Sequence, residues 1–228
     1  PMNAIVGMTA IATAHIDDRK QVQNCLRKIT LSSKHLLRLI NNVLDMSKIE
    51  SGKLTLTTEQ ISLKEVIEGI VNIMQPQIKT KKQTFDIHVK NILTENVWCD
   101  GVRLNQVLLN LLSNATKYTP EGGTIQLSLS EEKSPKGENY VRTYIKVKDN
   151  GIGMAPEFLK KIFESYSRAD GARIHKTEGT GLGMAITKYI VDAMEGTINI
   201  KSELDKGTEF LLTFDFEKAV VMEMNMVL

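Results

Sequence analysis

The sequence predicts an α+β protein, in which an N-terminal helical hairpin precedes an α/β sandwich with helices on one face of a mixed, mostly antiparallel sheet. One observation is a stretch from Gln21 to Ser51 that contains no Gly or Pro and repeats apolar residues every seven positions. Another is a series of segments that alternate apolar and polar residues and come in pairs joined by turns. Amphipathic helical patterns separate these pairs, which favours a layered sandwich. After Gly52 the sequence pattern changes from the seven-residue repeat to alternating segments, so we expect one domain over 1–52 and a second over 53–228.

The first domain is expected to be a helical hairpin. Val22, Ile29, Leu36 and Val43 recur at seven-residue intervals, which is typical of a coiled-coil seam. Residues 2–14 are also compatible with a helix, and the polar stretch HIDDRK separates the two segments. Because two helices bury little apolar surface by themselves, we expect two chains to close a dimeric four-helix bundle. The alternative is a hairpin that folds back onto the rest of its own chain.

The second domain is expected to alternate helices and strands. Ser62 and Glu65 form a capping box that opens one helix, Asp100 can cap another, and a third pattern ends before Gly196. The expected strands are KLTLT at 53–57, TFDIHV at 84–89, TIQLSLS at 124–130, YVRTYIKVKD at 140–149, TINIKS at 197–202 and TEFLLTFDF at 208–216. Several of these segments follow one another across short polar turns. The pattern therefore indicates hairpins, hence a mostly antiparallel sheet.

The composition excludes some partners. The 228 residues include 29 basic and 27 acidic side chains, a near balance that argues against nucleic acid and against contact with an anionic membrane. Cys25 and Cys99 have no second Cys or His at metal-ligand spacing, so buried, reduced thiols are expected. No run of about 18 apolar residues and no basic leader is present, and the chain starts at Pro1, which suggests a fragment.

Polar residues interrupt the apolar pattern of the helix capped by Asp100. Asn110 and Asn114 are four positions apart and Lys117 follows three later, so all three project from one side of that helix. An amide oxygen is a suitable ligand for Mg²⁺, and a nearby ammonium can meet a phosphate. By itself the spacing leaves open that both amides merely bond to neighbouring backbone.

The segment DNGIGM directly follows an expected strand. Gly151 and Gly153 permit close approach of the backbone, and Asp149 offers a carboxylate that can accept a hydrogen bond from the exocyclic amine of adenine. Guanine presents a carbonyl at that edge, so the carboxylate would also discriminate between the bases. An ordinary turn remains an alternative for this segment.

The segment EGTGLGMAI places Gly179, Gly181 and Gly183 before a helix, where backbone N–H groups can receive phosphate oxygens. It lacks the GK[ST] ending of a P-loop and does not follow a strand. A polar stretch with Arg168 and Arg173 precedes it, which could be a lid over a triphosphate or a solvated loop.

Together these segments resemble a known family. Asn110 to Tyr118, DNGIG, IFESYSR, GTGLGMAI and KGTEF are similar, in this order, to the N, G1, F, G2 and G3 boxes of sensor histidine kinases, whose ATP-binding domain belongs to the gyrase, histidine kinase and MutL superfamily. DMSKIESGKLTL resembles the segment that joins the dimerisation helices to the catalytic domain. The resemblance covers nearly the whole chain. It implies that 1–52 is a dimerisation hairpin and 53–228 a catalytic ATP-binding domain.

The resemblance implies ATP and Mg²⁺ as cofactors and assigns the site. Asn110, Asn114 and Lys117 would be catalytic, with Asn114 as the principal metal ligand and Asn110 beside it. The residues implied to bind ATP are Asn114, Lys117, Tyr118 (stacking on adenine), Asp149, Gly151, Gly153, Arg168, Gly179, Thr180, Gly181, Leu182, Gly183 and Thr208.

The chain departs from the family at its start. PMNAIVGM resembles the tail of the box that holds the phospho-accepting histidine, so the resemblance implies that this histidine precedes Pro1. Neither His15 nor His35 stands in the expected context, and we assign neither as acceptor. Tyr166 replaces a usual phenylalanine, and Ser165 stands where proline is common.

The implied function is an ATP-dependent protein-histidine kinase core of a two-component system, which transfers the γ-phosphoryl group to a histidine for relay to an aspartate of a response regulator. Implied partners are a second copy of the chain, bound through the N-terminal helices, and a receiver domain. We expect a cytoplasmic protein, or the cytoplasmic portion of a membrane-anchored sensor. The alternatives are a gyrase- or MutL-like ATPase, disfavoured because Asn110 replaces their catalytic glutamate, and a non-catalytic nucleotide-binding scaffold.

Overall fold

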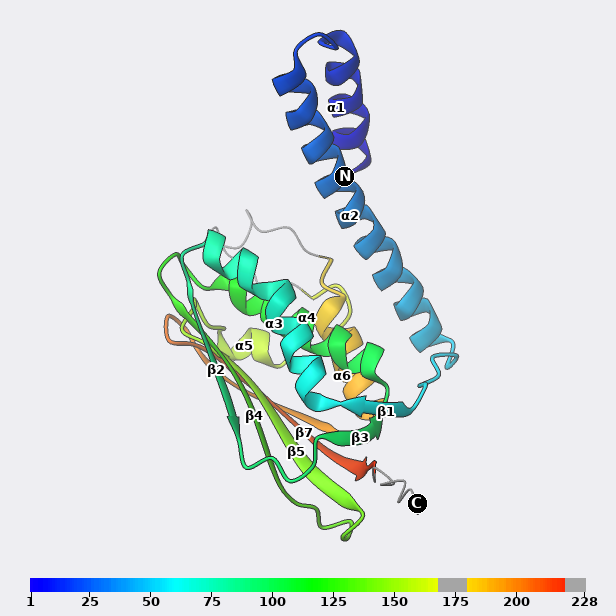
Figure 1. Ribbon diagram of the computed structural model, residues 1–228, viewed down its shortest axis with the longest axis vertical. Coiled ribbons are helices and arrows are strands. Elements are labelled where there is room, and N and C mark those ends of the chain that lie inside the picture. Colours follow the sequence, from blue (N-terminus) through cyan, green and yellow to red (C-terminus); the bar gives the residue numbers. More distant parts are fainter. Residues whose placement is uncertain (168–179, 220–228) are drawn as a thin grey trace, which may run out of the picture. The chain divides into compact units, whose positions relative to one another are not determined.

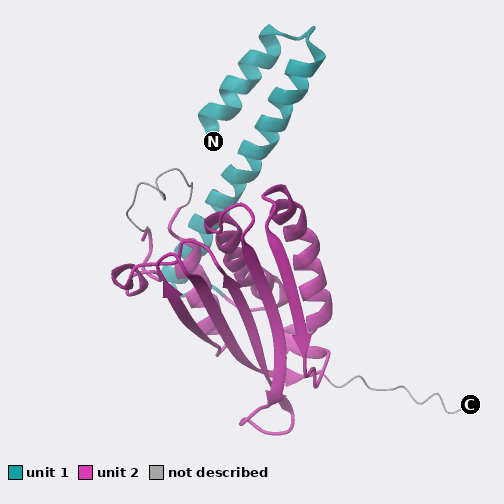
Figure 2. Ribbon diagram, turned by 90° about the vertical axis from the view of Figure 1, so that its left-hand side faces the viewer, with its two compact units in different colours: residues 1–54 teal, residues 55–228 magenta. Residues whose placement is uncertain are grey.

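A computed structural model describes residues 1–167 and 180–219. The chain divides into two compact units, Pro1–Leu54 and Thr55–Leu228, which are coloured separately in Figure 2. Within the described residues, no helix is long and apolar enough to cross a membrane. Cys25 and Cys99 are both buried free thiols, as predicted.

The first unit is the predicted helical hairpin. Helix α1 spans Met2–Ala14 and α2 spans Arg19–Glu50. The side chain of Asp18 caps α2 by accepting a hydrogen bond from the backbone N–H of Gln21 at 3.0 Å. Large apolar side chains stay exposed along this unit, among them Val6, Ile11, Leu26, Leu31, Leu37, Ile40, Val43 and Leu44.

The second unit contains four helices in its described part. The helices are α3 (Leu63–Thr80), α4 (Gly101–Tyr118), α5 (Pro156–Leu159) and α6 (Gly183–Ala193). The predicted caps are present: Ser62 Oγ accepts from the N–H of Glu65 at 3.2 Å, and Asp100 Oδ1 accepts from the N–H of Arg103 at 2.9 Å. These bonds explain why α3 and α4 begin where they do.

The strands form one seven-stranded sheet in the order β1-β3-β7-β5-β4-β2, with β6 also paired to β7. Their bounds are β1 Glu59–Ser62, β2 Thr84–Lys90, β3 Asn96–Cys99, β4 Thr124–Lys133, β5 Tyr140–Asp149, β6 Thr197–Glu203 and β7 Gly207–Lys218. β2 runs parallel to β4, whereas the other described pairs are antiparallel. The prediction of a mixed, mostly antiparallel sheet is confirmed.

One strand prediction was wrong. The segment KLTLT at 53–57 forms no strand, and pairing with β3 begins only at Glu59. The backbone N–H of Thr57 instead donates to Asp100 Oδ2 at 2.9 Å, while Leu54 is buried. Alternation in this short segment therefore reflects one buried side chain and a side-chain hydrogen bond, not a sheet ladder.

The core lies between the sheet and the helices α3, α4 and α6, which cover one face (Figure 1). Alternate residues of the central strands point into this layer and are buried, as the period of two requires. The largest fully buried side chains include Ile70, Met74, Leu104, Leu108, Leu111, Leu112, Ile125, Leu127, Ile145 and Phe214. The predicted placement of helices on one face is confirmed.

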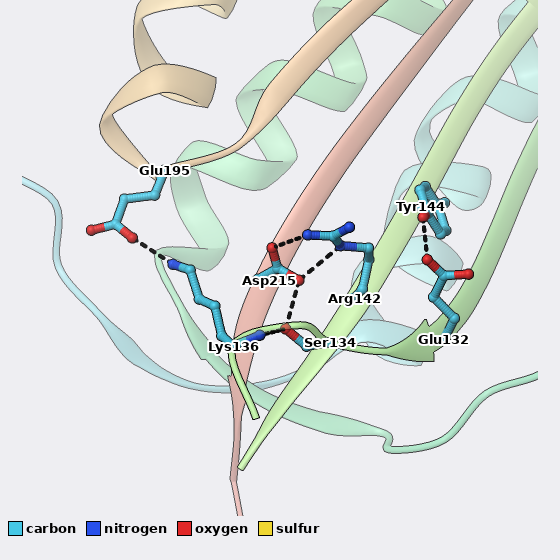
Figure 3. Close-up of polar contacts among 7 residues, drawn as sticks. All are labelled: Glu132, Ser134, Lys136, Arg142, Tyr144, Glu195 and Asp215. Atoms are coloured by element: carbon cyan, nitrogen blue, oxygen red, sulfur yellow. Dashed lines mark hydrogen bonds and ion pairs between the residues drawn. The ribbon is translucent and has the colours of Figure 1, made fainter. Parts of the chain in front are cut away.

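A cluster of polar side chains lies at the end of the sheet at which β5 begins (Figure 3). Arg142 donates two hydrogen bonds to Asp215, of 2.9 and 2.8 Å, and Ser134 donates a third of 2.7 Å. Lys136 forms an ion pair of 2.7 Å with Glu195, beyond the end of α6. Because Asp149 ends β5, this cluster lies at the opposite end of that strand from the predicted site.

Candidate nucleotide site

The predicted adenine-binding segment lies where the end of α4, the end of β5 and the β6–β7 turn meet. The N–H of Ile152 donates to the carbonyl of Tyr118 at 3.2 Å, and the N–H of Asp205 donates to the carbonyl of Ile152 at 2.8 Å. Residues far apart in the sequence are thus joined by backbone hydrogen bonds. This places Tyr118 beside the segment that follows Asp149.

Asp149 is a buried carboxylate, with 8% of its surface exposed. Its Oδ1 accepts from the N–H of Gly151 at 2.8 Å. Burial raises the pKa of Asp149, and the backbone N–H groups of Gly151 and Thr208 offset part of this rise. Among the described residues no Lys, Arg or His forms an ion pair with it. With no cationic side chain of the described residues paired to it, this carboxylate can accept a hydrogen bond from a donor such as the exocyclic amine of adenine.

Gly153 and Gly207 allow the backbone around Asp149 to close tightly. A Cβ on Gly153 would lie 1.9 Å from the carbonyl oxygen of Glu203, and one on Gly207 would lie 2.0 Å from that of Asp149. Both glycines also have positive φ, of 62° and 99°. Their role in this structure is to bring the segment after β5 against the β6–β7 turn.

The two predicted metal ligands face α6. Asn110 Nδ2 donates to Thr187 Oγ1 at 2.8 Å, and Asn114 Nδ2 lies 3.5 Å from Met184 Sδ. Among the described residues, the two amides contact side chains of α6 and form no hydrogen bond with neighbouring backbone, so the alternative that their spacing left open is wrong. Their oxygens are the hard donors that Mg²⁺ prefers, and the residues therefore fit this ion.

Gly183 makes that approach possible. A Cβ at Gly183 would lie 2.5 Å from Asn110 Oδ1 and 3.0 Å from its Nδ2. A side chain there would force the Asn110 side chain or the first turn of α6 to move. The glycine-rich segment is thereby held next to both amides, with the N–H groups of the first turn of α6 at the same place.

Lys117 and Tyr118 lie together at the end of α4. The ammonium of Lys117 is 4.8 Å from the centroid of the Tyr118 ring, within reach of a cation–π contact. Tyr118 is half-buried. The assignment of this ring to adenine stacking stays a prediction.

Other predicted residues are placed in different ways. Thr180 Oγ1 accepts from the N–H of Leu182 at 3.3 Å, whereas the side chain of Leu182 is 1% exposed and belongs to the core. The side chain of Leu182 is therefore not available to a ligand in this structure. Thr208 lies beside Asp149 and shares a 2.9 Å hydrogen bond with Ser202. Arg168 and Gly179 lie outside the described residues.

Sequence reasoning missed four side chains that support the site. Thr187 and Met184 contact the amides, while Lys81 and Gln83 bond to the carbonyl groups at the end of α4. None of them lies in a recognisable motif together with its partner. Only a prediction that α3 and α6 both pack against α4 could have found them.

Comparison with known proteins agrees with this fold. The family model of "Histidine kinase-, DNA gyrase B-, and HSP90-like ATPase" matches residues 99–218. A second, "His Kinase A (phospho-acceptor) domain", matches residues 1–52. The first defines the class, a nucleotide-binding domain of this ATPase type. With both matched in this order, the chain belongs to the sensor histidine kinase family.

Among similar proteins is the "Autoinducer 2 sensor kinase/phosphatase LuxQ" of Vibrio vulnificus, 35% identical over 96% of the chain. The "Sensory/regulatory protein RpfC" of Xanthomonas campestris is 36% identical over 92%. The chain spans 25% and 28% of the length of these relatives. A solved structure of full-length ShkA in complex with AMPPNP is 28% identical, with a TM-score of 0.74 over 97% of this chain and 44% of that one.

Proposed function

We propose that the chain binds magnesium-ATP and donates its γ-phosphoryl group to a histidine, as the catalytic core of a two-component kinase. One observation carries the proposal. The amides of Asn110 and Asn114 stand against the glycine-rich start of α6, while a buried carboxylate, Asp149, ends the neighbouring strand β5. This arrangement supports a site for phosphates and a metal next to a site for the base, in one domain.

Each residue has a role that its surroundings support. Asp149 accepts the hydrogen bond of the adenine amine, and the ring of the half-buried Tyr118 stacks on the base. Asn114 and Asn110 offer amide oxygens to the metal, and the ammonium of Lys117 meets the phosphates. When bound, Mg²⁺ neutralises charge on the transferring phosphoryl group and orients it.

The chain's residues favour transfer to an external nucleophile over hydrolysis. An amide cannot take a proton from water, so Asn110 cannot serve as the general base that a glutamate would supply. The domain instead holds the nucleotide until a neutral imidazole attacks phosphorus. The N–P bond forms as the bond to the bridging oxygen of ADP breaks, and the imidazole loses a proton. This disfavours the gyrase- or MutL-like ATPase.

We infer that residues 1–52 form the dimerisation domain and 53–228 the catalytic domain. The exposed apolar side chains of α1 and α2, such as Val6 and Leu37 with 66% and 60% exposure, are suited to a second copy of the hairpin. The resulting four-helix bundle would present the phosphohistidine to a receiver domain. A kinase that uses ATP and a response regulator would work in the cytoplasm.

The test is a phosphotransfer assay. The chain is incubated with Mg²⁺, γ-labelled ATP and a separate polypeptide bearing the phospho-acceptor helix of a relative such as LuxQ. We expect acid-labile label on that polypeptide, lost by at least a hundredfold in Asn114→Ala, because the metal ligand is removed. Free phosphate without labelled protein would favour the ATPase, and bound ATP without either product would favour a scaffold.

A further inference from the structure

We propose that Thr187 is a positioning residue for the magnesium-binding amides: its hydroxyl fixes the side chain of Asn110 so that amide oxygens, not amide nitrogens, are offered to the metal. The inference rests on the proposed magnesium-ATP site and deepens it. Thr187 lies on α6, and its side chain is linked to the site by the hydrogen bond from Asn110.

The contact is short and protected from water. Asn110 Nδ2 donates to Thr187 Oγ1 at 2.8 Å, across 77 positions of sequence. Thr187 is 1% exposed, so water does not compete freely for its hydroxyl. A hydrogen bond in such surroundings is expensive to leave unmade, because the buried hydroxyl would lose its partner.

Met184, one turn before Thr187, is a second acceptor that faces the two amides. Its Sδ lies 3.5 Å from Asn114 Nδ2 and 4.0 Å from Asn110 Nδ2. A thioether can accept a hydrogen bond but cannot donate one, so an amide oxygen turned toward it would gain nothing. The acceptors of α6 therefore take the N–H groups of both amides.

With the N–H groups of both amides directed to acceptors of α6, the inference is that their oxygens are the atoms offered to a ligand. Asn110 Oδ1 faces the first turn of α6, where a Cβ on Gly183 would lie 2.5 Å away. Mg²⁺ binds oxygen and not the nitrogen of an amide. A half-turn of the Asn110 amide would exchange the two atoms, break the bond to Thr187 and present N–H groups to the metal. The hydroxyl of Thr187 thus stabilises the orientation that can bind Mg²⁺.

The test measures nucleotide binding over a Mg²⁺ series, not activity. In Thr187→Val, which keeps the shape and removes the hydroxyl, we expect the Mg²⁺ concentration for half-maximal ATP binding to rise about fivefold to tenfold. ATP binding in EDTA should change less than twofold, because the base contacts are intact. Thr187→Ser, which restores the hydroxyl, should return the Mg²⁺ dependence to within twofold of the unaltered chain.

The matched control is Thr143→Val, the same substitution at a buried threonine of β5 whose hydroxyl has no hydrogen-bond partner in the described structure. It should leave the Mg²⁺ dependence unchanged. The ¹⁵N resonance of the Asn110 side-chain amide should shift in Thr187→Val and not in Thr143→Val. If Thr187→Val does not fold, Thr187→Ala carries the same test.

An unchanged Mg²⁺ dependence in a folded Thr187→Val or Thr187→Ala chain would overturn the inference. Failure of Thr187→Ser to restore the dependence would also overturn it, since packing and not the hydroxyl would then be responsible. If the unaltered chain binds no ATP with or without Mg²⁺, the proposed function itself fails, an outcome distinct from both.

Discussion

Asp149 and Glu131 are both buried carboxylates, with 8% and 4% of their surfaces exposed. Burial raises the pKa of each, and backbone N–H groups offset part of the rise. Glu131 Oε2 accepts from Leu93 and Thr94 at 2.6 and 2.9 Å, which fastens the β2–β3 loop. Its Oε1 is buried with no hydrogen-bond partner in the described structure. Asp149 instead lies at the candidate nucleotide site.

Glu131→Gln should make the protein more stable at neutral pH. The native pKa of Glu131 is raised above its ordinary value of 4.5, so the native state holds the proton more tightly than the unfolded chain. The stabilisation from this group is complete below about pH 4.5 and is lost as the pH rises through the native pKa. Thermal unfolding from pH 4 to 8 should therefore show the Tm of the variant exceeding that of the unaltered chain by a growing margin.

Glutamine keeps an oxygen for the two loop N–H groups, so ATP affinity of Glu131→Gln should stay within twofold of the unaltered chain. A Tm difference that shrinks as the pH rises would contradict the assignment, because it would mean that the charged form of Glu131 is the stabilising one.

The residues that sequence reasoning found and missed differ in the range of their contacts. Asn110 and Asn114 are visible because polar side chains interrupt one helical face, and Asp149 because it ends a strand before a glycine turn. The contacts of Thr187 with Asn110 and of Lys81 with Thr116 span 77 and 35 positions. These contacts depend on which helices pack together, and a local sequence pattern holds no information about that packing.

At the scale of elements, the end of α4 is held by side chains from the neighbouring α3–β2 segment. Lys81 Nζ donates to the carbonyl groups of Thr116, Lys117 and Thr119 at 2.7, 3.2 and 3.3 Å. Gln83 Nε2 donates to those of Thr116 and Thr119 at 3.1 and 2.6 Å. The last carbonyls of a helix have no intrahelical partner, so these bonds satisfy them and fix Tyr118 between them.

Lys81→Met should destabilise the catalytic unit by about 1–3 kcal/mol, because it leaves partly buried carbonyl groups without a donor. Urea unfolding measures this loss. ATP binding should weaken several-fold even where the variant is fully folded, since the position of Tyr118 depends on the same bonds.

Lys82→Met is the matched control. Lys82 forms an ion pair of 2.6 Å with the exposed Glu121, of a kind that contributes little. Equal losses of stability in the two variants would show that Lys81 acts through general charge and not through the end of α4.

Helix starts were predictable because Ser62 and Asp100 cap them locally, through bonds to residues three positions later. β3 was missed because it is only four residues long, and its pairing with β1 and β7 is entirely non-local. The segment 53–57 was wrongly predicted to be a strand. Alternation of apolar and polar residues does not by itself provide a neighbouring strand with which to pair.

At the scale of the molecule, the β-hairpins and the placement of the helices on one face could be predicted from alternation and from turn residues. The order of the strands in the sheet could not be predicted. β2 lies parallel to β4, and β7 is shared by β5 on one edge and by β6 and β3 on the other. These choices depend on how the whole sheet buries its face against α3, α4 and α6. This arrangement brings the ends of α4 and β5 together at the site.

The most direct test of the account is ATP binding by calorimetry, with and without Mg²⁺, for the unaltered chain, Asn114→Ala and Asp149→Asn. The unaltered chain should bind ATP in EDTA and more tightly with Mg²⁺. Asn114→Ala should keep the binding seen in EDTA and lose the gain from Mg²⁺, whereas Asp149→Asn should lose at least tenfold in both conditions. A Mg²⁺ gain that survives Asn114→Ala, or full affinity in Asp149→Asn, would contradict the assignment of metal and base to these two residues.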